Sequence, residues 1–469
     1  MHDSKELDHL LSLIADKKID SVIKMPASGG NRKYYRIILK DSTSLIGVIA
    51  DDLHEARSFV GLSQLFRKHG IAVPRILAYS DSYQYYIEED LGYQSLYDRI
   101  INNEYSDDLI GEVMRQLAKM QCVKETEWAQ LVTHKPFCTR QVMWDLNYFK
   151  YEYLKPCGIV FNEDALEDDF ESLALRLTGV PKDCWGFQMR DCQSRNVMLS
   201  PEPVFIDYQS GRYGPGVYDA VSFLWQAKAG FEDSFRSEML DIYASEFAVI
   251  RAIDKRKILS YADIFALFRT LQVLGAYGFR GLIEKRAHFI ESIPYALRNL
   301  NDLIRRGILK DYAELEKVCS AICSDVRFVP VVNDGKLAVK IFSFSYKKGY
   351  PEDLSGNGGG FMFDCRGMHN PGRYDRFKPL TGRDKPVIDF LSERGEADNF
   401  VENAFKLVAS SIETYLRRGF SSLQIGFGCT GGRHRSVYCA EKMARLIKQT
   451  FPQSEVILNH REQDIYEKL

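Results

Sequence analysis

Residues 189–209 read MRDCQSRNVMLSPEPVFIDYQ, and this stretch gives the clearest indication of the fold of the first part of the chain. Asn196 comes five residues after Asp191, and Asp207 comes eleven residues after Asn196. Apolar runs at 197–199 and 204–206 predict two short strands joined by a turn that contains proline. In a kinase, one Asp orients the attacking hydroxyl, and an Asn and a second Asp hold Mg²⁺ on the nucleotide phosphates. The spacing predicts such a catalytic loop.

The composition is that of a globular protein of two or three domains. The chain has 469 residues, 45% hydrophobic and 27% charged, with a net charge of −2. No apolar run reaches the roughly 18 residues of a membrane helix, and the polar N-terminus lacks a signal-peptide core. The ten cysteines are scattered without a C-x-x-C pair, which indicates a reduced protein. We therefore expect a cytoplasmic protein with no membrane partner.

The order of predicted elements divides the chain into three parts. Residues 24–50 and 83–88 have strand patterns, residues 54–69 a helical one, and EEDLG at 88–92 is a plausible hinge. Residues 106–123 and most of 140–320 have helical patterns, whereas strands and helices alternate after Ser324. The prediction is an α+β protein-kinase-like bilobal domain, with a β-rich lobe at 1–90 and a helical lobe at 91–324, followed by an α/β domain at 325–469.

Residues 20–320 resemble the aminoglycoside phosphotransferase/choline kinase superfamily, and within it the cell-wall sugar kinases. The stretches that carry the resemblance are SGGNRKYYR, EEDLG, MRDCQSRN and FIDYQSGRYGPGVYD. The resemblance implies a bilobal fold with ATP in the cleft. Its implied roles are catalytic base for Asp191, Mg²⁺ ligands for Asn196 and Asp207, and a buried brace of the catalytic loop for Asp219. The implied nucleotide contacts are Gly29, Gly30, Arg32, Lys33, Glu55 and Glu89.

Two positions depart from the family pattern. Met189 stands where the family has His, and the strand at 45–50 lacks the Lys that usually pairs with a helix Glu such as Glu55. Arg32, Lys33 or Arg36 could replace that Lys. The departures leave open a nucleotide-binding pseudokinase. Residues 137–155 are rich in aromatics where this family builds its acceptor pocket, so Trp144, Asp145 and Tyr148 are acceptor candidates; the alternative is an aromatic core helix.

A second signal is GCTGGRHRS at 428–436, a Gly-rich turn between a predicted strand and a predicted helix. Backbone N–H groups at such a helix start favour an anion, so phosphate is the expected ligand. The same loop fits C-x5-R-[ST], with Cys429 as nucleophile and Arg435 as phosphate clamp. A cysteine phosphatase is therefore an alternative, with Asp364 or Asp384 as its general acid.

Residues 325–469 resemble the C-terminal domain of RapZ, the RNase adapter protein. The matching segments are FSFSYKKGYPED, FMFDCRGMHNPGRY, PLTGRDKPV, GCTGGRHRSV and NHRE. The resemblance implies a site for an amino-sugar phosphate and contacts to RNA and protein partners. The candidate ligand-binding residues are His369, Asn370, Cys429, Thr430, Gly431, Gly432, Arg433, His434 and Arg435. RapZ has a P-loop domain before this one, and here no G-x4-G-K-[ST] occurs.

The leading hypothesis is an ATP- and Mg²⁺-dependent kinase for a sugar or amino sugar, with a C-terminal domain that senses a sugar phosphate. The first alternative is a pseudokinase adapter that binds a sugar phosphate and RNA. RNA is kept open as a partner because residues 325–469 have more Lys and Arg than Asp and Glu. The second alternative is a Cys429 phosphatase. The sequence does not set the oligomeric state.

Overall fold

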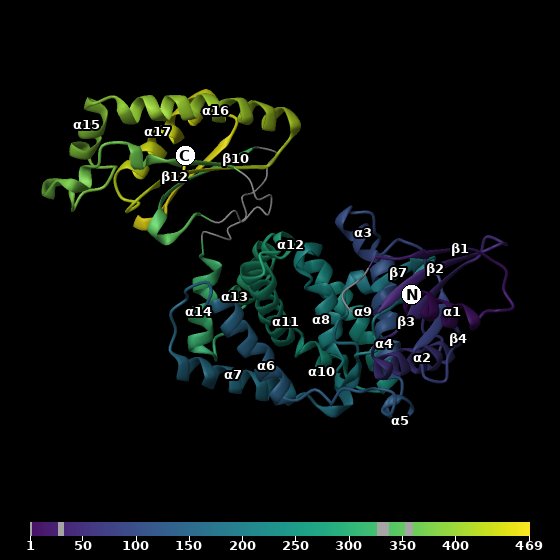
Figure 1. The fold of residues 1–469 in the computed structure, drawn as a ribbon. Helices are drawn as coiled ribbons and strands as arrows, with labels where there is room; N and C mark the ends of the chain where they lie inside the picture. The colour runs from purple at the N-terminus through teal and green to yellow at the C-terminus, as the bar shows by residue number, and fades with distance from the viewer. Residues whose placement is uncertain (1, 27–31, 326–336, 352–359) are drawn as a thin grey trace. The chain divides into compact units, whose positions relative to one another are not determined.

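The computed structural model describes residues 2–26, 32–325, 337–351 and 360–469 (Figure 1). Within it the chain forms two compact units. The first contains residues 1–279 and 295–323, and the second contains residues 280–294 and 324–469. Each unit has its own sheet and its own hydrophobic core.

The first lobe of the first unit is built on an antiparallel sheet in the order β1-β2-β3-β5-β4. Its elements are α1 (His2–Ser12), β1 (Ile19–Lys24), β2 (Lys33–Leu39), β3 (Ser44–Ile49), α2 (Leu53–Lys68), β4 (Ile76–Tyr79) and β5 (Tyr85–Glu89). Helix α1 covers one face, where a Cβ on Gly47 of β3 would lie 2.8 Å from the Leu10 side chain. The strands and the helix predicted from 24–50, 54–69 and 83–88 are confirmed.

Helix α2 shows how the sequence produces this lobe. The Asp52 side chain accepts hydrogen bonds from the backbone N–H of His54 and of Glu55, which satisfies two donors at the helix start. Phe59, Leu62 and Phe66 recur at helical spacing and are buried. The cap and the apolar face together fix where Glu55, in the first turn, lies.

The second lobe is mostly helical. Its helices are α3 (Leu96–Ile101), α4 (Asp107–Cys122), α5 (Glu125–Trp128), α6 (Thr139–Phe149), α7 (Glu163–Thr178), α8 (Val217–Leu224), α9 (Asp233–Arg251), α10 (Lys255–Leu259), α11 (Ala262–Tyr277), α13 (Ile293–Arg305) and α14 (Ala313–Cys323). Two small antiparallel hairpins interrupt them: β6 (Trp185–Gln188) with β9 (Arg212–Pro215), and β7 (Val197–Ser200) with β8 (Glu202–Phe205).

One helical stretch in the described part of the chain, Lys255–Ile283, is long and apolar enough to cross a membrane by length and composition. Most of its apolar window, 61%, is buried inside the protein. A core helix of a globular lobe has the same composition, so this stretch is weak evidence for a membrane span.

The second unit contains a five-stranded sheet in the order β11-β12-β10-β13-β14. Four strands are parallel and β14, at one edge, is antiparallel. The elements are α12 (Ala287–Ile290), β10 (Ala338–Ser345), β11 (Phe361–Asp364), α15 (Lys385–Glu393), α16 (Glu396–Arg418), β12 (Ser422–Cys429), α17 (Arg435–Thr450), β13 (Glu455–His460) and β14 (Ile465–Lys468). The predicted α/β pattern after Ser324 is confirmed, although α15 and β14 were not predicted.

Candidate active site and C-terminal ligand loop

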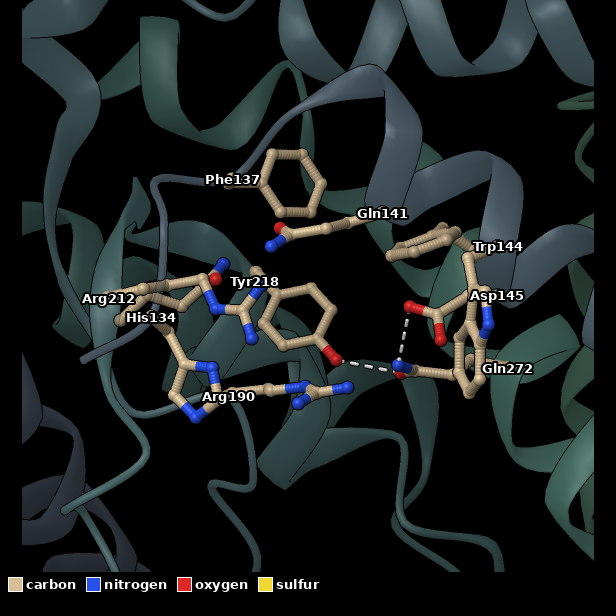
Figure 2. A pocket seen from close by; sticks show the side chains of 11 residues that line it. His134, Phe137, Gln141, Trp144, Asp145, Arg190, Arg212, Tyr218 and Gln272 are labelled. Carbon is tan, nitrogen blue, oxygen red and sulfur yellow. Dashed lines mark hydrogen bonds between the residues drawn. The ribbon is translucent and has the colours of Figure 1, made fainter. Parts of the chain in front are cut away.

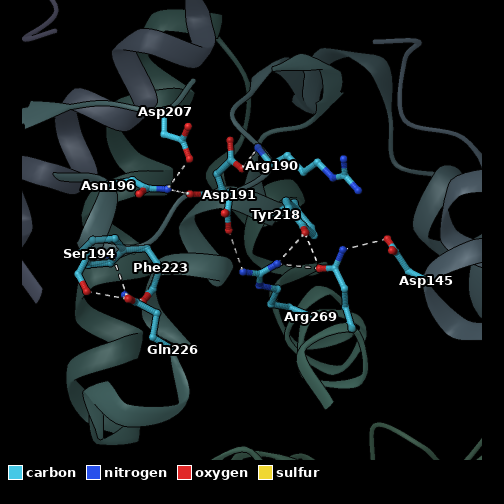
Figure 3. A network of polar contacts seen from close by, with 12 residues as sticks. Asp145, Arg190, Asp191, Ser194, Asn196, Asp207, Tyr218, Phe223, Gln226 and Arg269 are labelled. Carbon is cyan, nitrogen blue, oxygen red and sulfur yellow. Dashed lines mark hydrogen bonds and ion pairs between the residues drawn. The ribbon is translucent and has the colours of Figure 1, made fainter. Parts of the chain in front are cut away.

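The predicted catalytic loop joins β6 to the β7–β8 hairpin and brings Asp191, Asn196 and Asp207 together (Figure 3). The Asn196 side-chain amide donates to the Asp191 carbonyl oxygen at 2.9 Å and lies 3.3 Å from an Asp207 carboxylate oxygen. The hairpin shape explains the convergence, because it returns the chain to its starting point just before Asp207. The three residues thus share one site.

A buried carboxylate fixes the start of this loop. Asp219, in the first turn of α8, accepts hydrogen bonds from the backbone N–H of Met189 at 2.7 Å and of Arg190 at 3.0 Å. Arg190 has a φ of +73°, a conformation that costs a non-glycine residue about 1 kcal/mol or more. The Asp219 side chain therefore holds a strained backbone directly before Asp191, the bracing position that the family resemblance implied.

The carboxylate of Asp207 is a candidate ligand for a cation. Asp207 also has a left-handed backbone, with φ of +63°, and its carboxylate lies 3.3 Å from the Asn196 side-chain amide. Burial raises its pKa, and the nearby Asp191 carboxylate raises it further, while Gln209 and Arg32 lower it. A bound divalent cation would reverse this shift, because its charge favours the ionised carboxylate.

Few side chains at this site could bind a metal ion. In the described ranges, no group of three or more His, Cys, Asp and Glu side chains is arranged to hold a metal ion. Asn196 and Asp207 offer two oxygen ligands, and Mg²⁺ in phosphoryl-transfer sites takes further ligands from phosphates and water. The residues present therefore fit a Mg²⁺ ion that arrives with a nucleotide.

A cleft of about 900 Å³ lies beside these residues. Its walls come from both lobes of the first unit, and they include the candidates Arg32, Glu55, Glu89, Asn196 and Asp207. The volume lies near the upper end of the roughly 300–1,000 Å³ typical of ligand sites, which is enough for a nucleotide. Gly29 and Gly30, expected to cover the phosphates, lie outside the described residues.

Three basic residues could have replaced the missing strand Lys, and the structure separates them. Arg32 forms an ion pair with Glu55 of α2 inside the cleft. Lys33 is the next residue and points to the other face of β2, where its ammonium lies 2.8 Å from Glu6. Arg36 binds both carboxylate oxygens of Asp90, at 2.6 and 2.9 Å. Only the Arg32–Glu55 pair has the arrangement expected of the Lys–Glu pair of kinases.

Glu89, at the end of β5, lines the cleft but is engaged with the protein. One oxygen accepts a hydrogen bond from the Arg75 backbone N–H at 2.9 Å and lies 3.3 Å from the Arg67 guanidinium. Its neighbour Glu88 is more unusual, because burial raises the pKa of this carboxyl to about 8 against the opposing effect of Arg32. The protonated Glu88 contributes no charge to the cleft near pH 7.

A second and smaller pocket lies beside the catalytic loop, with a volume of about 240 Å³ (Figure 2). Its lining combines aromatic and polar side chains: His134, Phe137, Gln141, Trp144, Asp145, Gln188, Arg190, Arg212, Tyr218, Phe268 and Gln272. Trp144 is 61% exposed and stacks on Tyr148, so it is not a core residue. Tyr148 does not line this pocket.

A chain of polar contacts connects this pocket to Asp191 (Figure 3). The Arg269 guanidinium lies 3.5 Å from an Asp191 carboxylate oxygen and donates to the Gln272 side-chain oxygen at 2.8 Å. The Gln272 amide donates to Asp145 at 2.9 Å. Burial raises the pKa of Asp145 to about 6, and Arg190, Arg269 and Arg212 oppose the shift. The pocket and the Asp191 carboxylate therefore belong to one polar network.

Sequence reasoning found Trp144 and Asp145 in this pocket but missed Arg190, Arg212, Tyr218 and Gln272 of the lining, and Arg269 next to Gln272. These residues come from the catalytic loop, β9, α8 and α11, which are far apart in the sequence. The tyrosine hydroxyl of Tyr218 donates to Gln272 at 2.7 Å, so α8 and α11 meet at the pocket floor. Arg190 stands next to Asp191, and Arg212 and Tyr218 lie within the stretch FIDYQSGRYGPGVYD, but no sequence pattern assigned these three residues to a pocket.

In the second unit, the candidate loops lie at the carboxyl ends of the parallel strands β11 and β12, the edge at which ligands bind in open α/β sheets. Arg435 donates to the carbonyl oxygens of Arg366 and Met368, at 2.8 and 2.9 Å, and so ties the loop that carries His369 and Asn370 to the start of α17. Thr430 and Gly431 are exposed in the turn.

The Gly-rich turn needs a glycine at one position. Gly432 has a φ of +63°, and a Cβ there would lie 2.4 Å from Glu462 and 2.8 Å from the Ser345 backbone nitrogen. Its N–H donates to the Cys429 sulfur at 3.2 Å. No side chain fits there, so the turn stays close to the end of β10.

The basic side chains of this turn bind the protein itself. Arg433 donates to the carbonyl oxygens of Pro379 and Leu380, at 2.6 and 2.9 Å. His434 Nε2 donates to the Phe377 carbonyl at 2.9 Å, and burial lowers the pKa of His434, with Arg433 and Arg435 acting in the same direction. The neutral imidazole and the two guanidinium groups hold the segment 366–380 in place, so an anion would meet mainly backbone donors.

The phosphatase alternative requires the Arg435 guanidinium to face a phosphate beside Cys429. Arg435 is 5% exposed and is committed to two carbonyl oxygens, and Cys429 is 3% exposed with its sulfur 3.1 Å from the Ser436 hydroxyl. Asp364 pairs with Arg366 at 2.7 Å, and the Asp384 carboxylate caps Thr381 at 2.7 Å. This arrangement does not favour cysteine-phosphatase chemistry.

Comparison with protein families matches both parts of the chain. A family described as the phosphotransferase enzyme family matches residues 25–253, and the RapZ C-terminal domain matches residues 337–464. Among curated proteins, a nucleotide-binding protein of Chromobacterium violaceum is 33% identical over 172 residues, 37% of this chain and 58% of the relative. A nucleotide-binding protein of Dinoroseobacter shibae is 43% identical over 109 residues, 23% of this chain and 35% of the relative. The chain spans between about a third and three fifths of the length of these two relatives.

Two solved structures are similar at low identity. The choline kinase from Streptococcus pneumoniae has a TM-score of 0.45 at 13% identity, and the match covers 65% of this chain and all of that one. The Plasmodium vivax ethanolamine kinase has a TM-score of 0.42 at 15% identity, covering 61% of this chain and 83% of that one. The expected kinase-like α+β domain followed by an α/β domain is confirmed. The chain carries a domain of the phosphotransferase enzyme family at residues 25–253 and a RapZ C-terminal domain at residues 337–464.

Proposed function

We propose that the first unit is an ATP- and Mg²⁺-dependent kinase that phosphorylates a hydroxyl group of a small sugar, with amino sugars as the leading acceptor class. The observation that carries the proposal is the convergence of Asp191, Asn196 and Asp207 between a nucleotide-sized cleft and a small polar pocket. Phosphoryl transfer needs positioning and charge neutralisation more than covalent chemistry, and this arrangement supplies both.

Each residue has a defined task in this proposal. Asp191 accepts the hydrogen bond of the attacking hydroxyl, and the Arg269 guanidinium at 3.5 Å holds the carboxylate in position. Asn196 and Asp207 would hold the Mg²⁺, which neutralises charge on the nucleotide phosphates. Arg32, fixed by Glu55, contacts those phosphates from the first lobe.

The acceptor assignment rests on the small pocket. Its volume of about 240 Å³ lies below the roughly 300–1,000 Å³ of drug-sized ligand sites, which favours a single small ring. Asp145 and Gln272 offer hydrogen bonds to hydroxyl groups, and Trp144 offers an aromatic face. Such hydrogen-bonding groups and an aromatic face can bind the hydroxyls and the ring of a monosaccharide.

The test is sugar-dependent ADP release by the full-length protein with Mg²⁺, against N-acetylmuramic acid, N-acetylglucosamine, glucosamine and aminoglycosides. Asp191→Asn should lower turnover at least 100-fold, as loss of a general base does. Asp168→Asn, an exposed carboxylate on α7, is the matched control and should behave like the wild type. Turnover by Asp191→Asn at the wild-type rate would refute the assignment.

For the second unit, we propose that the Gly-rich turn and the 366–372 loop bind a sugar phosphate. The support is their shared position at the carboxyl ends of β11 and β12, with Thr430 and Gly431 exposed. Calorimetric titration with glucosamine-6-phosphate, with glucosamine as the neutral control, tests this. A phosphate-dependent signal that Gly432→Val abolishes is expected, and equal signals for both sugars would argue against the site.

A further inference from the structure

Two arginines line the small pocket, Arg190 and Arg212, and neither forms an ion pair with the carboxylate of Asp145 in the same lining. Arg212, on β9, is 4% exposed, and its Nε has no hydrogen-bond partner. Arg190 lies beside it, and in the part of the chain that the structure describes neither guanidinium forms an ion pair. Burial lowers the pKa of Arg212 and the neighbouring Arg190 lowers it further, while Tyr218 and Asp145 oppose the shift only in part. A buried cation without a partner is costly, so the site holds a charge that the protein itself does not neutralise.

The other charged groups around the pocket do not balance this charge. Asp145 is the one carboxylate in the lining, and one of its oxygens accepts a hydrogen bond from Gln272. Behind it, Arg269 adds a third guanidinium, which Asp191 faces at 3.5 Å. Burial lowers the pKa of His134, and the charges of Arg212 and Arg190 lower it further. The lining therefore has two cations against one anion near pH 7.

Figure 2 shows how these groups are divided across the pocket. Arg190, Arg212 and His134 lie on one side, and Trp144, Asp145 and Gln272 lie on the other. A ligand that spans the pocket would meet hydroxyl-binding groups at one end and guanidinium donors at the other. Guanidinium groups bind carboxylate and phosphate oxygens through paired N–H donors, and such bonds are stronger than neutral ones.

We propose that the acceptor carries an anionic group, a carboxylate or a phosphate, which Arg190 and Arg212 bind while a sugar hydroxyl faces Asp191. This inference rests on the kinase assignment and narrows its acceptor to sugar acids or sugar phosphates. A cationic acceptor such as an aminoglycoside meets net positive charge in this pocket and is disfavoured.

The first experiment compares acceptors that differ only in the anionic group, with the wild-type protein, ATP and Mg²⁺. N-Acetylmuramic acid against N-acetylglucosamine and glucuronic acid against glucose test a carboxylate, and glucosamine-6-phosphate against glucosamine tests a phosphate. The expected result is a kcat/KM roughly 10- to 100-fold higher for the anionic member of one pair, the effect of a charge-assisted hydrogen bond. Equal or higher kcat/KM for the neutral members overturns the inference and leaves the kinase assignment intact.

The second experiment uses Arg212→Met, which removes the charge and keeps the length of the side chain. The ratio of kcat/KM for the anionic acceptor to kcat/KM for the neutral acceptor should fall from its wild-type value to about 1. An equal loss for both acceptors would show that Arg212 acts on the transferring phosphoryl group, which also overturns the inference. Arg176→Met, on the exposed face of α7, is the matched control.

A binding measurement distinguishes the proposal of an anion site from the proposal of a kinase. Thermal shift of the protein with a non-hydrolysable ATP analogue is measured with each pair of sugars. A shift with the anionic sugar that Arg212→Met abolishes, without turnover of any sugar, would support the anion site and refute the kinase. Absence of both binding and turnover across the panel would refute both. Because the wild-type comparisons need no variant, a folding defect in Arg212→Met would not rescue the inference.

Discussion

Replacing Asp219 by Asn tests whether one buried carboxylate positions the catalytic loop. One Asp219 oxygen accepts hydrogen bonds from the Met189 N–H at 2.7 Å and the Gln121 amide at 3.0 Å, and the other accepts from the Arg190 N–H at 3.0 Å. In Asn, an NH₂ group replaces one oxygen and faces a donor. The best orientation of the amide keeps the two bonds at one oxygen and leaves the Arg190 N–H unsatisfied.

The expected loss has two parts. An unsatisfied buried donor costs about 1–3 kcal/mol, and loss of the negative charge weakens the two remaining bonds, so the free energy of unfolding should fall by about 2–4 kcal/mol. The Arg190 backbone, released from its φ of +73°, should relax and displace Asp191. A displacement of about 1 Å at a reacting group can cost roughly 100-fold in rate. We therefore expect kcat to fall about 100-fold.

The assay is steady-state kinase turnover together with urea unfolding. Burial raises the pKa of Asp219 to about 7, with the Met189 and Gln121 hydrogen bonds opposing the shift, so the measurement is made at pH 8, where the wild-type carboxylate is ionised. The KM for ATP should stay within about threefold, because Asn196 and Asp207 do not contact Asp219. Wild-type kcat in a folded Asp219→Asn variant would refute the positioning role, whereas Asp168→Asn should change neither quantity.

Three further predictions concern single residues. Arg32→Met should raise the KM for ATP roughly 10- to 100-fold, the effect of losing a charge-assisted phosphate contact, whereas Lys33→Met, on the opposite face of β2, should change it less than about twofold. Asp145 has a folded-state pKa of about 6 against 3.8 unfolded. The native state therefore holds a proton that the unfolded state releases, and this stability is present below about pH 4 and lost as the pH rises through 6. Urea melts of wild type against Asp145→Asn should show that the wild-type advantage shrinks by up to about 3 kcal/mol between pH 4 and 7, and a constant difference would contradict the shift. Cys429→Ser should keep glucosamine-6-phosphate binding within about threefold, and neither protein should hydrolyse p-nitrophenyl phosphate, because a phosphate contacts the turn rather than the sulfur; hydrolysis that Cys429→Ser abolishes would restore the phosphatase alternative.

The sequence was sufficient for the predicted catalytic loop because its three residues lie shortly before and after one hairpin. A loop, two short strands and a proline-containing turn have few ways to arrange themselves, so linear spacing predicts that Asp191, Asn196 and Asp207 meet. The same holds for β2 and β3, whose β-branched and aromatic runs match the observed strands. Short-range sequence patterns are enough to predict such loops and strands, and the tertiary fold determines only how they pack.

The choice among Arg32, Lys33 and Arg36 was left open, although strand geometry carried a signal. Side chains alternate between the faces of a strand, so Arg32 and Arg36 share a face that Lys33 cannot share. The alternation does not decide which arginine meets Glu55. That depends on the packing of α2 against the sheet and on Asp90, which binds Arg36 and leaves Arg32 for Glu55. These are long-range contacts without a pattern in the sequence.

The basic residues of the two candidate ligand sites show why residue type alone does not identify a binding residue. Arg433 and Arg435 follow a Gly-rich turn at a helix start, and both bind backbone carbonyls of a neighbouring loop. Arg212 lies in the short strand β9, away from any helix start, and has a buried nitrogen with no hydrogen-bond partner. What distinguishes them is whether the fold already satisfies the guanidinium donors. An arginine whose donors are satisfied stabilises the protein, and a buried arginine with unsatisfied donors gains most from an anionic ligand. By this criterion the acceptor pocket, rather than the Gly-rich turn, is where an anion should depend on arginine side chains.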